Sequence, residues 1–244
     1  MSTVQNQIIT LFIPCLIDTF YPNVGEAVVR VFRKLGVGVR YPEAQTCCGQ
    51  PAFNAGYRKE ARSAARHFID VFAGTDPIVC PSGSCVSMVR NHYPELFRND
   101  PAIFPRALDV GARTFEFSEY LVDQLGVEDV GAEGRGRVVY HDSCHLLRGL
   151  RIQHQPRELL RQIRGIEFVE MDNADYCCGF GGSFSVTYPA ISTAMVEDKV
   201  RHIVDARADT VVAADMGCLM NIQGMLHRKN LPVQAKHIAQ MLAE

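Results

Sequence analysis

The sequence predicts an α/β protein made of two similar halves, each a small parallel sheet with flanking helices, related by an internal repeat. Three observations support this prediction. One cysteine pattern occurs twice with nearly the same spacing. Short apolar, β-branched runs accompany each copy of the pattern, and amphipathic helical stretches lie between and after those runs. Strands that alternate with helices in this way are typical of parallel sheets.

The repeat is defined by its cysteines. In the first half, 31 residues separate Cys15 from Cys47, and 36 separate Cys48 from Cys85. In the second half, the corresponding gaps are 32 residues, from Cys144 to Cys177, and 39 residues, from Cys178 to Cys218. Each adjacent pair is followed by a glycine, Gly49 or Gly179. The gaps agree within three residues, so the two halves are expected to superpose.

The repeat also predicts the domain limits. We expect a first cysteine-rich half at residues 1–115, a connecting helix and linker at 116–136, and a second cysteine-rich half at 137–244. The stretch Gly126–Arg137 is rich in glycine and charge, which is typical of a linker.

Four short apolar runs are predicted to be buried strands: Ile8–Pro14, Pro77–Cys80, Arg137–Tyr140 and Thr210–Ala213. One predicted helix carries Val24, Val28, Val31 and Leu35 on one face and ends at Gly36. The other predicted helices are Arg58–Phe72, Pro156–Arg164, Ile191–Ala206 and Met216–Leu226. The first and last cysteines of each set come just after a predicted strand: Cys15, Cys85, Cys144 and Cys218. Ligands of open α/β sheets bind beyond the carboxyl ends of the strands, and this places both sets at such an edge.

Composition excludes several functional classes. A net charge of −2 argues against nucleic-acid binding, which requires an excess of clustered basic residues. No apolar run is long enough to span a bilayer, and no signal-peptide pattern begins the sequence, so the expected location is the cytoplasm. Walker, nucleophile-elbow and metalloprotease motifs are missing from the sequence. The stretch Gly179–Gly182 lacks a complete dinucleotide-binding fingerprint.

Nine cysteines in a cytoplasmic chain indicate metal or redox chemistry rather than structural disulfides. Four thiolates per half satisfy an iron–sulfur cluster, for which we expect [4Fe–4S], one per half. They also satisfy a structural zinc ion, which remains the alternative. An adjacent cysteine pair favours the cluster, since it is awkward around one tetrahedral ion. The predicted ligands are Cys15, Cys47, Cys48, Cys85, Cys144, Cys177, Cys178 and Cys218.

Four stretches carry a resemblance to a known family: Pro81–Cys85, Tyr140–Leu150, Cys177–Phe184 and Asp215–Gly224. They resemble the cysteine-rich domain shared by iron–sulfur subunits of heterodisulfide reductase, glycolate oxidase and anaerobic glycerol-3-phosphate dehydrogenase. Within this group the sequence is most similar to the lactate-utilisation protein A family, nearly from end to end.

This resemblance implies an iron–sulfur electron-transfer subunit of a complex that oxidises L-lactate to pyruvate in lactate catabolism. It implies two partners, an iron–sulfur ferredoxin-like protein and a third subunit, and no catalysis by the chain alone. The alternatives are a cluster-based disulfide reductase subunit of the heterodisulfide reductase type and a zinc-stabilised interaction module. The cysteine-rich subunit of heterodisulfide reductase uses a fifth cysteine three positions before the last, where this chain has Ser82 and Asp215.

Four further residues are left with two interpretations each. Cys80 has no counterpart in the second half, where Ala213 stands at the matching position, and it is expected to be a core residue or a displaced fifth ligand. His141 and Asp142 either cap the following helix or act on the cluster, and His145, beside a ligand, is favoured for a functional role.

Overall fold

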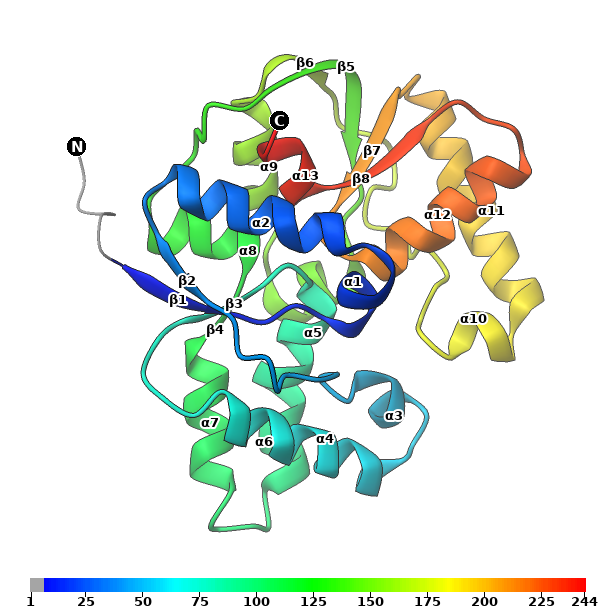
Figure 1. Cartoon of the computed structure of the whole chain (residues 1–244). Helices are drawn as coiled ribbons and strands as arrows, with labels where there is room; N and C mark the ends of the chain where they lie inside the picture. The colour runs from blue at the N-terminus through cyan, green and yellow to red at the C-terminus, as the bar shows by residue number, and fades with distance from the viewer. Residues whose placement is uncertain (1–6) are drawn as a thin grey trace. The chain divides into compact units, whose positions relative to one another are not determined.

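The computed structural model describes residues 7–244, which divide into two compact units, one ending at Gly126 and the other beginning at Val127. Figure 1 labels the helices and strands of both units. Within the described residues, each unit has one four-stranded parallel sheet, with the orders β2-β1-β3-β4 and β6-β5-β7-β8. The two orders correspond strand for strand, so the predicted α/β fold in two similar halves is confirmed.

The strands and helices of the first unit alternate along the chain. Its strands are β1 (Ile8–Leu11), β2 (Gly38–Arg40), β3 (Ile78–Cys80) and β4 (Thr114–Glu116). Its helices are α1 (Cys15–Phe20), α2 (Pro22–Lys34), α3 (Gln50–Asn54), α4 (Arg58–Val71), α5 (Gly83–Ser87), α6 (Tyr93–Phe97), α7 (Phe104–Arg113) and α8 (Phe117–Glu119), with π-helical turns at Met88–His92 and Tyr120–Gln124. Helices α2 and α8 lie on one face of the sheet, and α4, α6 and α7 lie on the other (Figure 1).

The second unit has the same layers. Its strands are β5 (Glu133–Tyr140), β6 (Arg164–Phe168), β7 (Thr210–Ala213) and β8 (Gln234–His237). Its helices are α9 (His154–Arg161), α10 (Phe184–Thr187), α11 (Pro189–Asp205), α12 (Met216–Arg228) and α13 (Ile238–Leu242), with a π-helical turn at His145–Gly149. Helices α11 and α12 cover one face of this sheet, whereas α9 and α13 cover the other (Figure 1).

The inner strands are those that the sequence predicted. β3 and β7 are buried along their whole length, as is the last part of β5, because helices cover both faces of each sheet. The outer strands β2, β4, β6 and β8 were not predicted. β2, β6 and β8 are mostly exposed or half-buried and carry polar side chains, so they lack the continuous apolar run that marks a buried strand. β4 is more buried but has only three residues. β5 also begins at Glu133, inside the predicted linker.

The sequence of α2 explains where this helix begins, where it ends and which face is buried. Pro22 opens α2 in its first turn, where its missing N–H costs nothing, and Arg33 and Lys34 lie in the last turn, which favours positive charge. Val24, Val28 and Val31 share the buried face of this helix.

None of the helices in residues 7–244 is both long and apolar enough to cross a membrane.

Candidate metal centres

The first set of four cysteines gathers at the carboxyl edge of the first sheet. Cys15 is the first residue of α1, directly after β1, and Cys85 is the third residue of α5, after β3. Cys47 and Cys48 lie in the loop that leads from β2 to α3. Strand ends of a parallel sheet meet at one edge, which explains why residues so far apart in sequence come together.

The four sulfurs of this first centre form a chain of contacts. The Sγ atoms of Cys15 and Cys47 are 3.6 Å apart, and those of Cys48 and Cys85 are 3.5 Å apart. The two cysteines of the adjacent pair also interact with each other. Cys15 is exposed, whereas Cys48 and Cys85 are buried, so the centre reaches from the surface into the unit.

Raised and lowered thiol pKa values alternate along this chain of sulfurs. A hydrogen bond from Cys15 and the interaction with Cys48 lower the pKa of Cys47 to about 3, and a hydrogen bond from Cys48 lowers the pKa of Cys85 well below its ordinary value. The donors Cys15 and Cys48 have raised pKa values, because their hydrogen bonds to these partners and their burial both disfavour the thiolate. All four groups can be thiolates together only when a cation balances them, which fits a metal or iron–sulfur group.

The second centre repeats this arrangement. Cys144 follows β5 at the start of the π-helical turn, Cys177 and Cys178 lie in the loop before α10, and Cys218 is the third residue of α12. Interactions with Cys144 and Cys178 lower the pKa of Cys177 to about 2, and interactions with Cys178 and His141 lower the pKa of Cys218 well below its ordinary value. Each predicted set of four cysteines is therefore brought together, and their role as ligands stays a prediction.

The glycine after each cysteine pair is required by backbone geometry. Gly49 and Gly179 have positive φ angles of 85° and 80°, a conformation that other residues rarely adopt. A Cβ atom at Gly179 would lie 2.7 Å from the carbonyl oxygen of Ser192, and one at Gly49 would lie 3.1 Å from the Cβ of Ala64. In this conformation the N–H of each glycine donates to the Sγ of the first cysteine of its pair, Cys47 or Cys177, at 3.4 Å.

A side chain also anchors each cysteine pair from the helical segment after the third strand. The hydroxyl of Tyr93 donates to the carbonyl of Cys48 at 2.9 Å, and the amide of Asn221 donates to the carbonyl of Cys178 at 2.7 Å. Sequence reasoning missed both residues. Both side chains hold the carbonyl of the second cysteine of the pair, but one is a phenol and the other an amide, and they lie at different sequence separations from the last cysteine. The sequence repeat therefore does not reveal them.

Cys80 is a core residue that also contacts the first centre. It is fully buried at the end of β3, and its Sγ donates to the carbonyl of Ser82 at 3.8 Å. It also hydrogen-bonds the side chain of Cys85 and helps to lower the pKa of that thiol. Ser82 itself accepts the backbone N–H of Cys85 and so caps α5. Both interpretations of Cys80 stay open on this geometry.

Polar residues around Cys144 distinguish the second centre from the first. His145 lies beside the ligand candidate, with Nδ1 3.6 Å from the Sγ of Cys144. Asp142 does not cap a helix: it is buried and accepts two hydrogen bonds of 2.7 Å from Arg157 of α9. Arg148 donates to the carbonyl of Asp175 and so fastens the loop that precedes Cys177.

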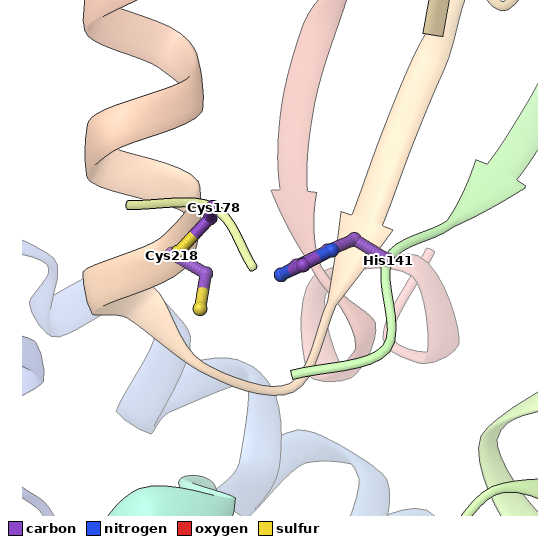
Figure 2. A group of neighbouring side chains, drawn as sticks. All are labelled: His141, Cys178 and Cys218. Carbon is purple, nitrogen blue, oxygen red and sulfur yellow. The ribbon is translucent and has the colours of Figure 1, made fainter. Parts of the chain in front are cut away.

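His141 is the residue whose importance the sequence understated. It is fully buried, and one of its ring nitrogens lies within 4.8 Å of the Sγ atoms of Cys178 and Cys218. Figure 2 shows the tip of the ring pointing toward these two cysteines. The sequence feature that could have indicated this role is the position of His141, three residues before the predicted ligand Cys144. The sequence could not show that its side chain turns into the centre.

The Cysteine-rich domain (CCG) family model matches the chain twice, at residues 9–90 and 138–223. Lactate utilization protein A of Geobacillus kaustophilus is 48% identical over 234 residues, covering 96% of this chain and 98% of the relative. The chain belongs to the lactate utilization protein A family. Lactate utilization protein A 2 of Bacillus cereus is 44% identical, with 97% of this chain and 98% of the relative covered.

Solved structures add little to this assignment. A glutamate racemase from Francisella tularensis, crystallised with D-glutamate, aligns over 98% of this chain and 78% of its own. Its sequence identity is 12% and its TM-score is 0.39, values too low to support any conclusion about this chain.

Proposed function

We propose that this chain is the iron–sulfur electron-transfer subunit of a complex that oxidises L-lactate to pyruvate. The observation that carries the proposal is the convergence of four cysteines at the carboxyl edge of each sheet. The chain's membership of the lactate utilization protein A family supplies the substrate. Oxidation of lactate to pyruvate releases two electrons and two protons, and iron–sulfur clusters accept and release electrons singly.

The surroundings of the cysteines suit this role. The first centre has an exposed cysteine, Cys15, beside two buried ones. Cys144 and Cys177 of the second centre are half-buried, whereas Cys178 and Cys218 are buried. Each site is thus held by the core and has an edge that a redox partner can approach.

The substrate chemistry belongs to a partner under this proposal. The sequence has no complete dinucleotide-binding fingerprint, so no group in this chain is assigned to take a hydride from lactate. Two partner proteins of lactate utilisation, one an iron–sulfur ferredoxin-like protein, complete the proposed complex. The isolated chain should therefore not turn over lactate.

A zinc-stabilised interaction module is the second candidate, and one observation favours it. The sulfur pairs of the first centre are separated by 3.5 and 3.6 Å. Two thiolates on one tetrahedral zinc ion, each at roughly 2.3 Å from the metal, are separated by about 3.8 Å. The third candidate, a cluster-based disulfide reductase, differs from the first in that the chain itself would act on a disulfide substrate.

Two measurements separate the three candidates. Anaerobic purification with iron, sulfide and zinc quantified together should give iron and sulfide in equal amounts and little zinc. The chain reconstituted with its two partners should then reduce an artificial electron acceptor when L-lactate is added. Full lactate oxidation by zinc-loaded protein would overturn the electron-transfer proposal. Disulfide reduction by the isolated iron-loaded chain would establish the third candidate in its place.

A further inference from the structure

The strongest unassigned feature is the environment of His141, and the inference drawn from it rests on the proposed metal centres. His141 follows the last residue of β5 and is fully buried. Its Nδ1 lies 3.2 Å from the carbonyl oxygen of Ala174. Its Nε2 is buried and makes no hydrogen bond of ordinary geometry among residues 7–244, and the ring interacts with the side chain of Cys218, whose pKa it helps to lower. A buried imidazole nitrogen that lacks such a hydrogen bond is costly, which indicates that something else satisfies it.

The contact with Ala174 determines which nitrogen is available. A carbonyl oxygen can only accept a hydrogen bond, so Nδ1 of His141 carries the proton and donates it. In the neutral ring Nε2 then presents a lone pair. This is the arrangement of a metal-bound histidine, in which a backbone carbonyl orients the ring and fixes its tautomer.

The carbonyl of Ala174 is itself firmly placed. It also accepts the backbone N–H of Asp142 at 3.0 Å and the ammonium group of Lys199 at 3.1 Å. Lys199 is fully buried and makes a second hydrogen bond to the carbonyl of Asn173. The ring of His141 is therefore held in one orientation before any metal binds, as a ligand should be.

Among the described residues of the first unit, the corresponding positions hold apolar side chains. Phe12 and His141 stand three residues before Cys15 and Cys144, so they occupy corresponding positions. The helix residues that contact the glycine after each cysteine pair align the two helices, and in that alignment Lys199 corresponds to Phe68. Phe12 and Phe68 contact each other edge to face, with ring centroids 4.9 Å apart. An apolar pair thus backs the first centre, whereas an imidazole and a buried cation back the second.

We propose that Nε2 of His141 binds a metal atom of the second centre together with Cys178 and Cys218, whose ligand atoms all lie within 4.8 Å of one another. The second centre is then a cysteine–histidine site, and the first is an all-cysteine site. A four-ligand site of this kind takes one further thiolate, from Cys144 or Cys177, so a neutral imidazole stands in place of the fourth thiolate. The centre is then less negative and its reduction potential is higher, as in the histidine-ligated Rieske centres. The second centre is therefore the higher-potential site of the chain.

The test uses the full chain carrying Cys48→Ser, so that the first centre contributes no signal. The protein is labelled with [¹⁵N]histidine, reconstituted with iron and sulfide, reduced, and measured by pulsed EPR. A strong nitrogen coupling that changes with the isotope is expected. Adding His141→Gln should remove this coupling, and adding the matched His145→Gln should keep it. Absence of a strong coupling, or its survival in the His141→Gln variant, would overturn the proposal.

A second arm keeps the inference separate from the iron–sulfur assignment. The metal-free Cys48→Ser chain is loaded with zinc alone, and X-ray absorption at the zinc edge counts nitrogen and sulfur ligands. A nitrogen ligand that disappears in the His141→Gln variant would support the histidine ligand even where the chain binds no iron. Zinc bound by sulfur alone in both proteins would contradict it. Far-UV circular dichroism of each variant confirms that the fold is kept.

Discussion

The two centres share a cysteine arrangement and differ in what lies behind it. In the first unit, Phe12 packs edge to face against Phe68 and Phe72, with centroids 4.9 and 5.5 Å away. In the second unit, the corresponding positions place a buried imidazole, His141, and a buried ammonium group, Lys199, near the sulfurs. Burial lowers the pKa of Lys199 to about 8, although nearby cysteine and aspartate side chains oppose this shift.

This comparison shows how a repeated fold can give two different sites. The sheet and the cysteine pair fix the positions of the thiols in both units. The residues behind the thiols were free to diverge, because either an apolar pair or a hydrogen-bonded polar set can fill the same space. On the proposed iron–sulfur assignment, two centres of different polarity should have different reduction potentials.

The largest expected effect comes from removing a cysteine of either pair. Cys48→Ser and Cys178→Ser should each lower bound iron by roughly half, since serine is a harder and poorly ionised ligand and one of two clusters is lost. Both should reduce lactate-dependent acceptor reduction by the reconstituted complex to background, because neither centre can substitute for the other in a series.

Co-purification with the partners is the control for this prediction. Both variants should still assemble, because the substitution is local. Activity that survives in only one variant would show that the corresponding centre lies off the electron path, and would break the symmetry between the two.

The next largest effect concerns the buried ion pair of Asp142 and Arg157 in the second unit. The position of Asp142 corresponds to Ile13 in the first unit, which cannot form such a pair. Arg157 holds the buried carboxylate of Asp142 with two hydrogen bonds. Arg157→Met should lower the free energy of unfolding by roughly 3–5 kcal/mol, because it leaves a buried charge uncompensated. Arg161→Met is the matched control on the same helix: Arg161 pairs with Glu170 at the surface, and its loss should cost about 1 kcal/mol or less. Urea unfolding measures both variants, and equal effects would refute the assignment.

A smaller, pH-dependent effect is expected at the fourth strand of each sheet, where Glu116 corresponds to His237. Both residues cap the following helix. Burial raises the pKa of Glu116 from 4.5 to about 8, although hydrogen bonds from Ser118 and Glu119 oppose the shift. The folded chain therefore holds a proton that the unfolded chain releases, and stability should fall as the pH rises from about 4.5 to about 8.

Glu116→Gln should remove this part of the pH dependence and make the variant relatively more stable at pH 8 and above. Urea unfolding between pH 5 and pH 9 measures the slope. Glu128→Gln, an exposed substitution, is the control and should leave the slope unchanged. An unaltered slope in the Glu116→Gln variant would show that this carboxyl group is not the source.

The smallest effect is expected at Cys80, which corresponds to Ala213. Cys80→Ala gives the first unit the residue of the second and should leave iron content nearly unchanged, with a stability loss of about 1 kcal/mol for the lost buried sulfur. Iron, sulfide and the unfolding midpoint are the measurements. Iron loss equal to that of Cys48→Ser would make Cys80 a fifth ligand and sharpen the difference between the centres.

The sequence by itself determined the architecture and the two sets of four cysteines. The inner strands β1, β3, β5 and β7 were predicted because strands buried on both faces are continuously apolar. The outer strands β2, β6 and β8 were missed because their exposed positions carry polar residues, and β4 because it is so short. The cysteine sets were predictable because the repeat preserves their spacing to within three residues.

Only the tertiary structure decided which polar residues face each centre. His141 and His145 are both near Cys144 in sequence. His141 turns its ring tip toward Cys178 and Cys218, whereas Nδ1 of His145 lies 3.6 Å from the Sγ of Cys144. Likewise, Asp142 accepts a hydrogen bond from Arg157, which is 15 residues away in sequence. Lys199 of α11 donates a hydrogen bond to the carbonyl of Ala174. Sequence spacing gives the distance between residues along one element, whereas contacts between elements depend on the direction in which each side chain leaves its backbone.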